Sequence, residues 1–171
     1  MIETSFHQDD RGGFARFFCR DELSTILKDR KICQINFSEN HQKGTIRGMH
    51  FQNNPYAEMK LIRCLRGRVF DVAIDLRKGS ETFLHFFSIE LSEQNKKMIV
   101  IPEGFAHGFQ VLEESSQLLY LHTSYYHPES EGGINPMDHR ISIEWPLPVT
   151  EISEKDINRP YLDEDYIGIE I

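Results

Sequence analysis

The sequence predicts an all-β fold, a sandwich or barrel of short strands with a few short helices. Runs of alternating apolar and polar residues fill most of the 171-residue chain. Turn signals such as Arg66-Gly67 separate these runs, which recur every 8–15 residues or so, roughly the spacing of all-β sandwiches and barrels. Parallel α/β folds place a helix between successive strands instead, and the chain lacks that alternation.

The alternating runs place the expected strands in order along the chain. They lie at 31–37, 61–65, 69–76, 83–91, 98–101, 108–112, 117–123 and 141–145. A helix is expected over 21–29, because Leu23, Ile26 and Leu27 recur at helical spacing after an acidic start. A second, short helix is expected over 153–157 with Ser153 as its N-cap.

Composition excludes several classes of protein. The net charge of −8 argues against a broad nucleic-acid-binding face. No apolar run approaches the ~20 residues of a membrane span, and residues 1–13 lack the features of a secretory signal. Three cysteines without a Cys-x-x-Cys pair fit a reduced protein, so we expect a cytoplasmic location.

Chemically versatile side chains gather around residues 47–52. If this segment is extended, His50 and Gln52 share one face and Arg47 lies on the other. Lys60 opens the next strand. A metal site is disfavoured because the chain has no His-x-His pattern and glutamine is a poor ligand.

Acid–base chemistry is the second hypothesis for these residues. Histidine as a residue type suits proton transfer near neutral pH, so His50 is a candidate base, and Asp156 could fix its tautomer. Tyr120 could supply a proton, and Lys60 could stabilise a developing oxyanion. From spacing alone, a structural histidine in a strand and a tyrosine in the core are the more frequent outcomes, so both interpretations stay open.

Arginines give a third signal. Arg11, Arg47 and Arg63 lie in Gly-rich or β-type sequence, and planar guanidinium groups suit phosphate oxygens. A small phosphorylated ligand and ordinary surface ion pairs explain them equally well. The chain has no P-loop, no Gly-x-Gly-x-x-Gly after a strand and no Gly-x-Ser-x-Gly elbow.

Several further stretches form distinctive motifs along the chain. They are DRGGF at 10–14, QINFS at 34–38, GTIRGMHFQ at 44–52, KLIRCLRGRVFDVAIDLRKGSETF at 60–83, IPEGFAHGF at 101–109, TSYYHPESEGGI at 123–134, IEWP at 143–146 and SEKD at 153–156. Taken together, these motifs resemble the dTDP-4-dehydrorhamnose 3,5-epimerase family, the RmlC-like cupins of nucleotide-sugar metabolism. The resemblance covers about residues 9–160.

The resemblance implies one cupin-type jelly-roll domain over 1–171, with a C-terminal segment near 147–171 packed on the barrel. It also implies a homodimer that uses neither metal nor cofactor, with a nucleotide-diphosphate sugar as its partner. The implied reaction inverts C3 and C5 of dTDP-4-dehydro-6-deoxy-D-glucose, a step of dTDP-rhamnose biosynthesis. A 3-only or 5-only epimerase, a ketoisomerase and a non-catalytic sugar-nucleotide binder are the alternatives.

The resemblance also implies roles for particular residues. The implied catalytic set is the base His50, its partner Asp156, the enolate-stabilising Lys60 and the proton donor Tyr120. The implied substrate-binding or pocket-lining set is Arg11, Arg16, Gln34, Asn36, Arg47, His107 and Tyr126. Arg16 stands where family members often carry a glutamate, so this position bears on which nucleotide sugar is bound.

Overall fold

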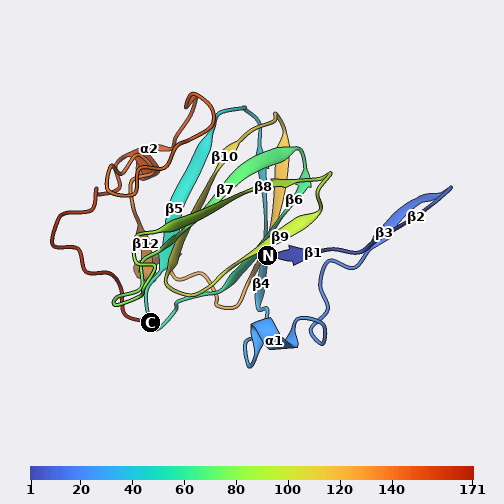
Figure 1. Ribbon diagram of the computed structural model, residues 1–171, viewed down its shortest axis with the longest axis horizontal. Coiled ribbons are helices and arrows are strands. Elements are labelled where there is room, and N and C mark those ends of the chain that lie inside the picture. Colours follow the sequence, from blue (N-terminus) through green and yellow to red (C-terminus); the bar gives the residue numbers. More distant parts are fainter.

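Two antiparallel five-stranded sheets face each other in the computed structural model, which describes residues 1–171 (Figure 1). The first sheet, in spatial order, contains β1 (Ile2–Glu3), β9 (Lys97–Ile101), β6 (Lys60–Arg66), β11 (Ser116–His122) and β4 (Gln34–Asn40). The second contains β12 (Glu131–Gly133), β5 (Ile46–Gln52), β10 (Phe105–Val111), β7 (Arg68–Asp75) and β8 (Phe86–Ser92). The expected all-β, cupin-type fold is confirmed.

The inward faces of both sheets change from apolar to polar along the strands. On β6 the inward residues run from Cys64 and Ile62 to Lys60, and on β11 they run from Leu118 to Tyr120. The apolar end closes into a core. Its buried members are Ile62, Cys64, Val69, Ala73, Leu91, Ile99, Ile101, Phe109, Val111 and Leu118. The polar end stays open because its side chains do not fill the space between the sheets.

Other segments cover the outer faces of the two sheets. Helix α1 (Ser24–Leu27) packs Leu27 against the first sheet, where it meets Leu61 and Leu121. On the second sheet, the chain after β12 packs Leu162 and its apolar neighbours against Ile74. This C-terminal segment includes the short helix α2 (Glu154–Ile157), which lies beside β5 (Figure 1). No helix has the length and apolar character that crossing a membrane requires.

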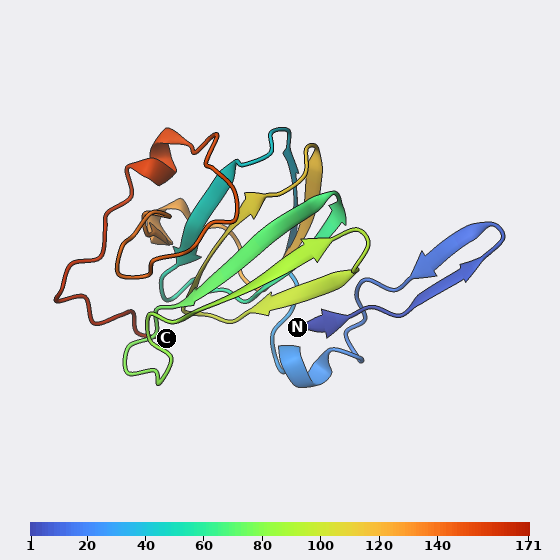
Figure 2. The same ribbon diagram turned by 45° about the horizontal axis from the view of Figure 1, so that its top comes forward.

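A separate hairpin projects from the barrel near the N-terminus (Figures 1 and 2). It consists of β2 (Phe6–Asp9) and β3 (Gly12–Ala15), which pair only with each other. Phe14 on this hairpin is 70% exposed, an unusual position for a large aromatic side chain.

The structure corrects three of the expected elements. The strand expected at 31–37 lies at Gln34–Asn40, and the helix expected over 21–29 is a single turn that ends where Lys28 adopts a φ of 53°. The strand expected at 141–145 is wrong. Alternate side chains there, including Ile141 and Trp145, do pack on the second sheet, but no neighbouring strand pairs with this backbone.

A bulge in β5 corrects the expected face of Arg47. His50 pairs with His107 on β10, whereas Arg47 pairs with Phe109. The pairs are three residues apart on β5 but two residues apart on β10, so β5 contains one extra residue. Because of this extra residue, the side chains at 47 and 50 no longer point to opposite faces of the sheet. Arg47 and His50 therefore share the inward face, and Met49 points into the outer cluster.

Gly48 makes this bulge possible. Its φ is +123°, and a Cβ there would lie 2.5 Å from the Cα of Gly108 on β10. A larger residue at this position would therefore be both strained and overpacked.

We expect Gly48→Ala to lower the free energy of unfolding by about 3 kcal/mol or more, because backbone strain and overpacking act together. Gly79 is the matched control: its φ is +73° but its Cβ would meet nothing. Urea unfolding that shows equal losses in Gly48→Ala and Gly79→Ala would contradict this role.

Candidate active site

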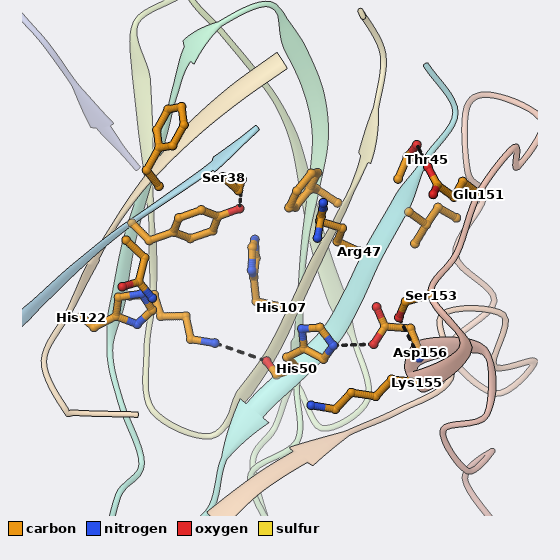
Figure 3. Close-up of a pocket in the computed structure, with 16 residues that line it drawn as sticks. Ser38, Thr45, Arg47, His50, His107, His122, Glu151, Ser153, Lys155 and Asp156 are labelled. Atoms are coloured by element: carbon orange, nitrogen blue, oxygen red, sulfur yellow. Dashed lines mark hydrogen bonds and ion pairs between the residues drawn. The ribbon is translucent and has the colours of Figure 1, made fainter. Parts of the chain in front are cut away.

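A cavity of about 450 Å³ opens at the polar end of the barrel, within the size range of small-molecule sites (Figure 3). Side chains from both sheets and from the C-terminal segment line it. They are Asn36, Phe37, Ser38, Thr45, Ile46, Arg47, His50, Lys60, His107, Phe109, Tyr120, His122, Glu151, Ser153, Lys155 and Asp156. All four residues of the expected catalytic set are among them.

His50 and Asp156 form a hydrogen-bonded pair at the wall of the cavity. The His50 Nε2 and Asp156 Oδ1 atoms are 2.6 Å apart, and the Gly48 N–H donates to Asp156 Oδ2 over 3.2 Å. Burial alone raises the pKa of Asp156, but the hydrogen bond and charge of His50, helped by the Gly48 N–H, outweigh burial and lower it. Asp156 is therefore ionised at neutral pH and accepts the Nε2 proton of His50.

Local structure places Asp156 at this position. Residues 151–152 run beside the start of β5, where the Ile46 N–H donates to the Glu151 carbonyl over 2.9 Å. Helix α2 then begins with Ser153 as its N-cap, as the sequence predicts, and the Ser153 Oγ accepts from the Asp156 N–H. The cap turns Asp156 toward the bulge in β5.

Lys60 lies on the opposite side of the cavity, at the start of β6. Its Nζ is 3.2 Å from Glu58 Oε1 and 3.5 Å from the carbonyl oxygen of His50. The other oxygen of Glu58 lies 2.7 Å from His122 Nδ1. Burial alone raises the pKa of Glu58, but the hydrogen bond from His122 and the charge of Lys60 lower it below its usual value. Lys60 thus has an ionised partner.

Tyr120 faces the same cavity from β11. Its hydroxyl lies 3.0 Å from Ser38 Oγ, and its ring centroid is 6.4 Å from that of His107. Burial raises the pKa of Tyr120 far above its usual value, so the phenol keeps its proton at neutral pH. A protonated phenol is a hydrogen-bond donor and a potential acid.

Every histidine that lines the cavity is backed by a carboxylate, but His50 is far more exposed than the other two. The other two pairs are His107 with Asp71, at 3.0 Å, and His122 with Glu58. The His107 and His122 side chains are 6% and 10% exposed, whereas that of His50 is 37% exposed. Figure 3 shows the second ring nitrogen of His50 directed away from Asp156. His50 is therefore the histidine placed to exchange a proton with a bound molecule.

The expected binding residues divide into three groups. Asn36, Arg47 and His107 line the cavity. Gln34 and Tyr126 lie beside it: Gln34 donates to Asn36 over 3.2 Å and accepts from the Tyr126 N–H.

Arg11 and Arg16 do not reach the cavity of their own chain. Arg11 lies at the tip of the projecting hairpin and pairs with Asp9 at 2.6 Å. Arg16 follows β3 and pairs with Glu22 at 2.5 Å.

Sequence reasoning missed several residues of the site. Lys155, Glu151 and Thr45 line the cavity, and Glu58 and Asp71 stand behind its histidines. Asp71 had a usable signal, since an acid within the apolar run 69–76 needs a partner if it is buried. The others stand in segments whose pairing the sequence does not reveal. No group of three or more His, Cys, Asp or Glu side chains is arranged to hold a metal ion.

The fold is a barrel, and the cavity at its polar end brings together a histidine, a lysine and a tyrosine, side chains that suit acid–base chemistry. Comparison with known proteins then gives the family. The family model described as dTDP-4-dehydrorhamnose 3,5-epimerase matches residues 1–164. The dTDP-4-dehydrorhamnose 3,5-epimerase of Salmonella typhimurium is 42% identical over 168 residues, which cover 96% of this chain and 90% of that protein.

Solved structures agree with the family model. The Legionella pneumophila 3,5-epimerase RmlC in complex with dTDP-4-keto-L-rhamnose superposes with a TM-score of 0.90 at 38% identity, over 99% of this chain and 92% of that one. A 3'-monoepimerase from Streptomyces bikiniensis, in complex with dTDP-quinovose, superposes with a TM-score of 0.87 at 28% identity, over 94% and 81%. The chain belongs to the dTDP-4-dehydrorhamnose 3,5-epimerase family. It is an isomerase, as the motifs indicate.

Ionised Asp156 should make stability depend on pH. Its pKa is below the ordinary value of 3.8, so its contribution is complete above that value and is lost as the pH falls through the lower, folded pKa. We expect Asp156→Asn to lower the free energy of unfolding by about 2 kcal/mol at pH 7. The difference in free energy of unfolding between Asp156→Asn and the unmutated protein should become smaller below pH ~4. Urea unfolding at several pH values measures this difference. A difference that does not change with pH would contradict an ionised Asp156.

Proposed function

We propose that this chain inverts C3 and C5 of dTDP-4-dehydro-6-deoxy-D-glucose and so forms dTDP-4-dehydro-L-rhamnose. The proposal rests on one observation: four side chains suited to this reaction line the same cavity. His50 is exposed to the cavity and hydrogen-bonded to buried Asp156, and Lys60 and Tyr120 line the cavity as well. Membership of the 3,5-epimerase family supports the choice of substrate.

His50 acts as the base in the proposed mechanism. Protons on carbons next to a keto group are acidic because the resulting carbanion is an enolate. Asp156 accepts the Nε2 proton of His50, so the Nδ1 lone pair faces the cavity and removes the proton from C3 or C5. Asp156 also stabilises the imidazolium that forms.

Lys60 and Tyr120 complete each inversion. The Lys60 ammonium lines the cavity and is proposed to stabilise the negative charge that develops on the C4 oxygen. Inversion requires the proton to return on the other face of the carbon, and Tyr120, held protonated by its burial, supplies it. One enolate oxygen serves both C3 and C5, so a single lysine suffices for both steps.

The remaining residues are proposed to bind the nucleotide. Arg47 offers a planar cation for the diphosphate, and Asn36, Gln34 and His107 offer polar contacts around it. Tyr126 is proposed to contact the ligand at the cavity rim. Binding far from the reacting carbons positions the sugar and leaves the catalytic groups free for chemistry.

A monofunctional epimerase is the second candidate. The fold of this chain matches that of a 3'-monoepimerase as well as that of the 3,5-epimerases. The same four groups support one inversion or two, because the outcome depends on how the sugar ring turns between steps.

We also propose that the protein is a homodimer. Phe14 on the hairpin and Ile35 and Phe37 on β4 are 70%, 63% and 57% exposed, and an isolated two-stranded hairpin is marginally stable. Packing on a second copy would cover these side chains and carry Arg11 and Arg16 onto the partner. A single 20.0 kDa species in analytical ultracentrifugation would contradict the homodimer.

A cytoplasmic location is also proposed. The three cysteines are free thiols, and reduced thiols are typical of cytosolic proteins.

A proton NMR time course in D2O tests the proposed function. The substrate is dTDP-4-dehydro-6-deoxy-D-glucose. Deuterium at both C3 and C5 is the expected result. Deuterium at one carbon supports the monofunctional candidate, and exchange at neither carbon contradicts epimerisation of this substrate.

Two variants separate the proposed roles in the same assay. His50→Ala should slow exchange at both carbons by at least ~10²-fold, because the base is gone, while dTDP still binds. Tyr120→Phe should slow formation of the inverted product more than it slows proton removal. Near-normal turnover in His50→Ala would refute the base assignment. Equal losses of exchange and inversion in Tyr120→Phe would assign the tyrosine to positioning.

A further inference from the structure

Glu58 and His122 form a buried polar pair that the acid–base mechanism does not use. The side chains of Glu58, Lys60 and His122 are 8%, 10% and 10% exposed. His122 on β11 stands directly opposite Lys60 on β6. Burying an ionised carboxylate is costly unless its partners compensate, so this pair needs a physical explanation.

We propose that Glu58 and His122 are positioning residues that aim the Lys60 ammonium at the keto oxygen of the substrate. This inference rests on the proposed function and assigns two further residues to it. An ammonium group has three donors. Glu58 Oε1, at 3.2 Å, and the His50 carbonyl, at 3.5 Å, take two of them. The third donor is left for the cavity.

His122 holds Glu58 in the required orientation. The Glu58 carboxylate is ionised, so the 2.7 Å contact places a proton on His122 Nδ1, which donates to Oε2. This donor fixes one oxygen and leaves Oε1 for Lys60. His122 Nε2 is buried with no hydrogen-bond partner, so it does not offer a contact to a ligand. His122 thus acts through Glu58.

Without Glu58 and His122, the Lys60 ammonium would not be held in one orientation. Its side chain has four rotatable bonds, and the His50 carbonyl alone is a weak anchor at 3.5 Å. Misplacing a catalytic group by about 1 Å can cost about 10²-fold in rate. Because one keto oxygen serves both enolates, any loss at Lys60 affects C3 and C5 in proportion.

Glu58→Gln tests the proposal by exchange in D2O with dTDP-4-dehydro-6-deoxy-D-glucose. We expect exchange at C3 and at C5 to slow by the same factor, about 10- to 100-fold, with KM within about threefold of the unmutated value. Glu103→Gln is the matched control, since it removes a carboxylate paired with Arg30 away from the cavity. Unchanged or faster exchange in Glu58→Gln, or slowing at one carbon alone, would overturn the proposal.

Variants of His122 test the link to Glu58. His122→Asn keeps a donor near the position of Nδ1 and should stay within about threefold of normal exchange, whereas His122→Leu should fall as far as Glu58→Gln. The double variant Glu58→Gln/His122→Leu should be no slower than Glu58→Gln, because residues in one chain of contacts do not add. Equal losses of exchange rate in His122→Asn and His122→Leu would overturn the role of His122. So would a double variant whose loss of exchange rate equals the product of the two single losses.

Failure of the positioning role can be told apart from failure of the proposed function. If the unmutated protein does not exchange deuterium, the proposed function fails first. A crystal structure of Glu58→Gln then decides the positioning role without turnover. A Lys60 Nζ that stays in place would contradict it, and a displaced Nζ would support it. Should Glu58→Gln not fold, the His122→Asn and His122→Leu pair carries the same comparison.

Discussion

The hydrogen bond between His50 and Asp156 is the interaction on which the site depends. It joins a residue in the middle of β5 to one in the C-terminal segment, 106 positions later. The bulge at Gly48 supplies both halves of the arrangement: it turns Arg47 toward the same cavity as His50, and it offers the Gly48 N–H to the second oxygen of Asp156. The cap at Ser153 delivers the carboxylate from the other side.

Differences in burial give similar groups different roles. Three carboxylate–histidine pairs surround one cavity, and each has a short contact between ring nitrogen and carboxylate oxygen. The His50 ring is the most exposed of the three, whereas the His107 and His122 rings are largely enclosed. The same contrast separates Tyr120, which burial keeps protonated, from Asp156, which its partners keep ionised.

Local patterns predicted much of the fold and some of the site. Alternation located β6, β7, β8, β9, β10 and β11, because each strand buries one face against a partner sheet. The same alternation misled at 141–145, where the side chains pack on one side but the backbone has no strand to pair with. Ser153 was identifiable as a cap from its position before an acidic turn.

Long-range contacts account for what the sequence did not show. A bulge leaves no mark in the residue alternation, so Arg47 was placed on the wrong face. The pairing of His50 with Asp156 and of Lys60 with Glu58 depends on which segments meet in space. The motifs of the family indicated His50 and Asp156 as partners, and the geometry supplies the physical reason.

The tautomer of His50 tests most directly whether Asp156 holds the ring with a free nitrogen toward the cavity. Long-range nitrogen–proton NMR correlations of the nitrogen-15-labelled protein at neutral pH report which ring nitrogen carries the proton. We expect a proton on Nε2, held by Asp156, and a bare Nδ1 facing the cavity. A proton on Nδ1 with a bare Nε2 would contradict this arrangement, since the lone pair of the ring would then face Asp156 and not the substrate.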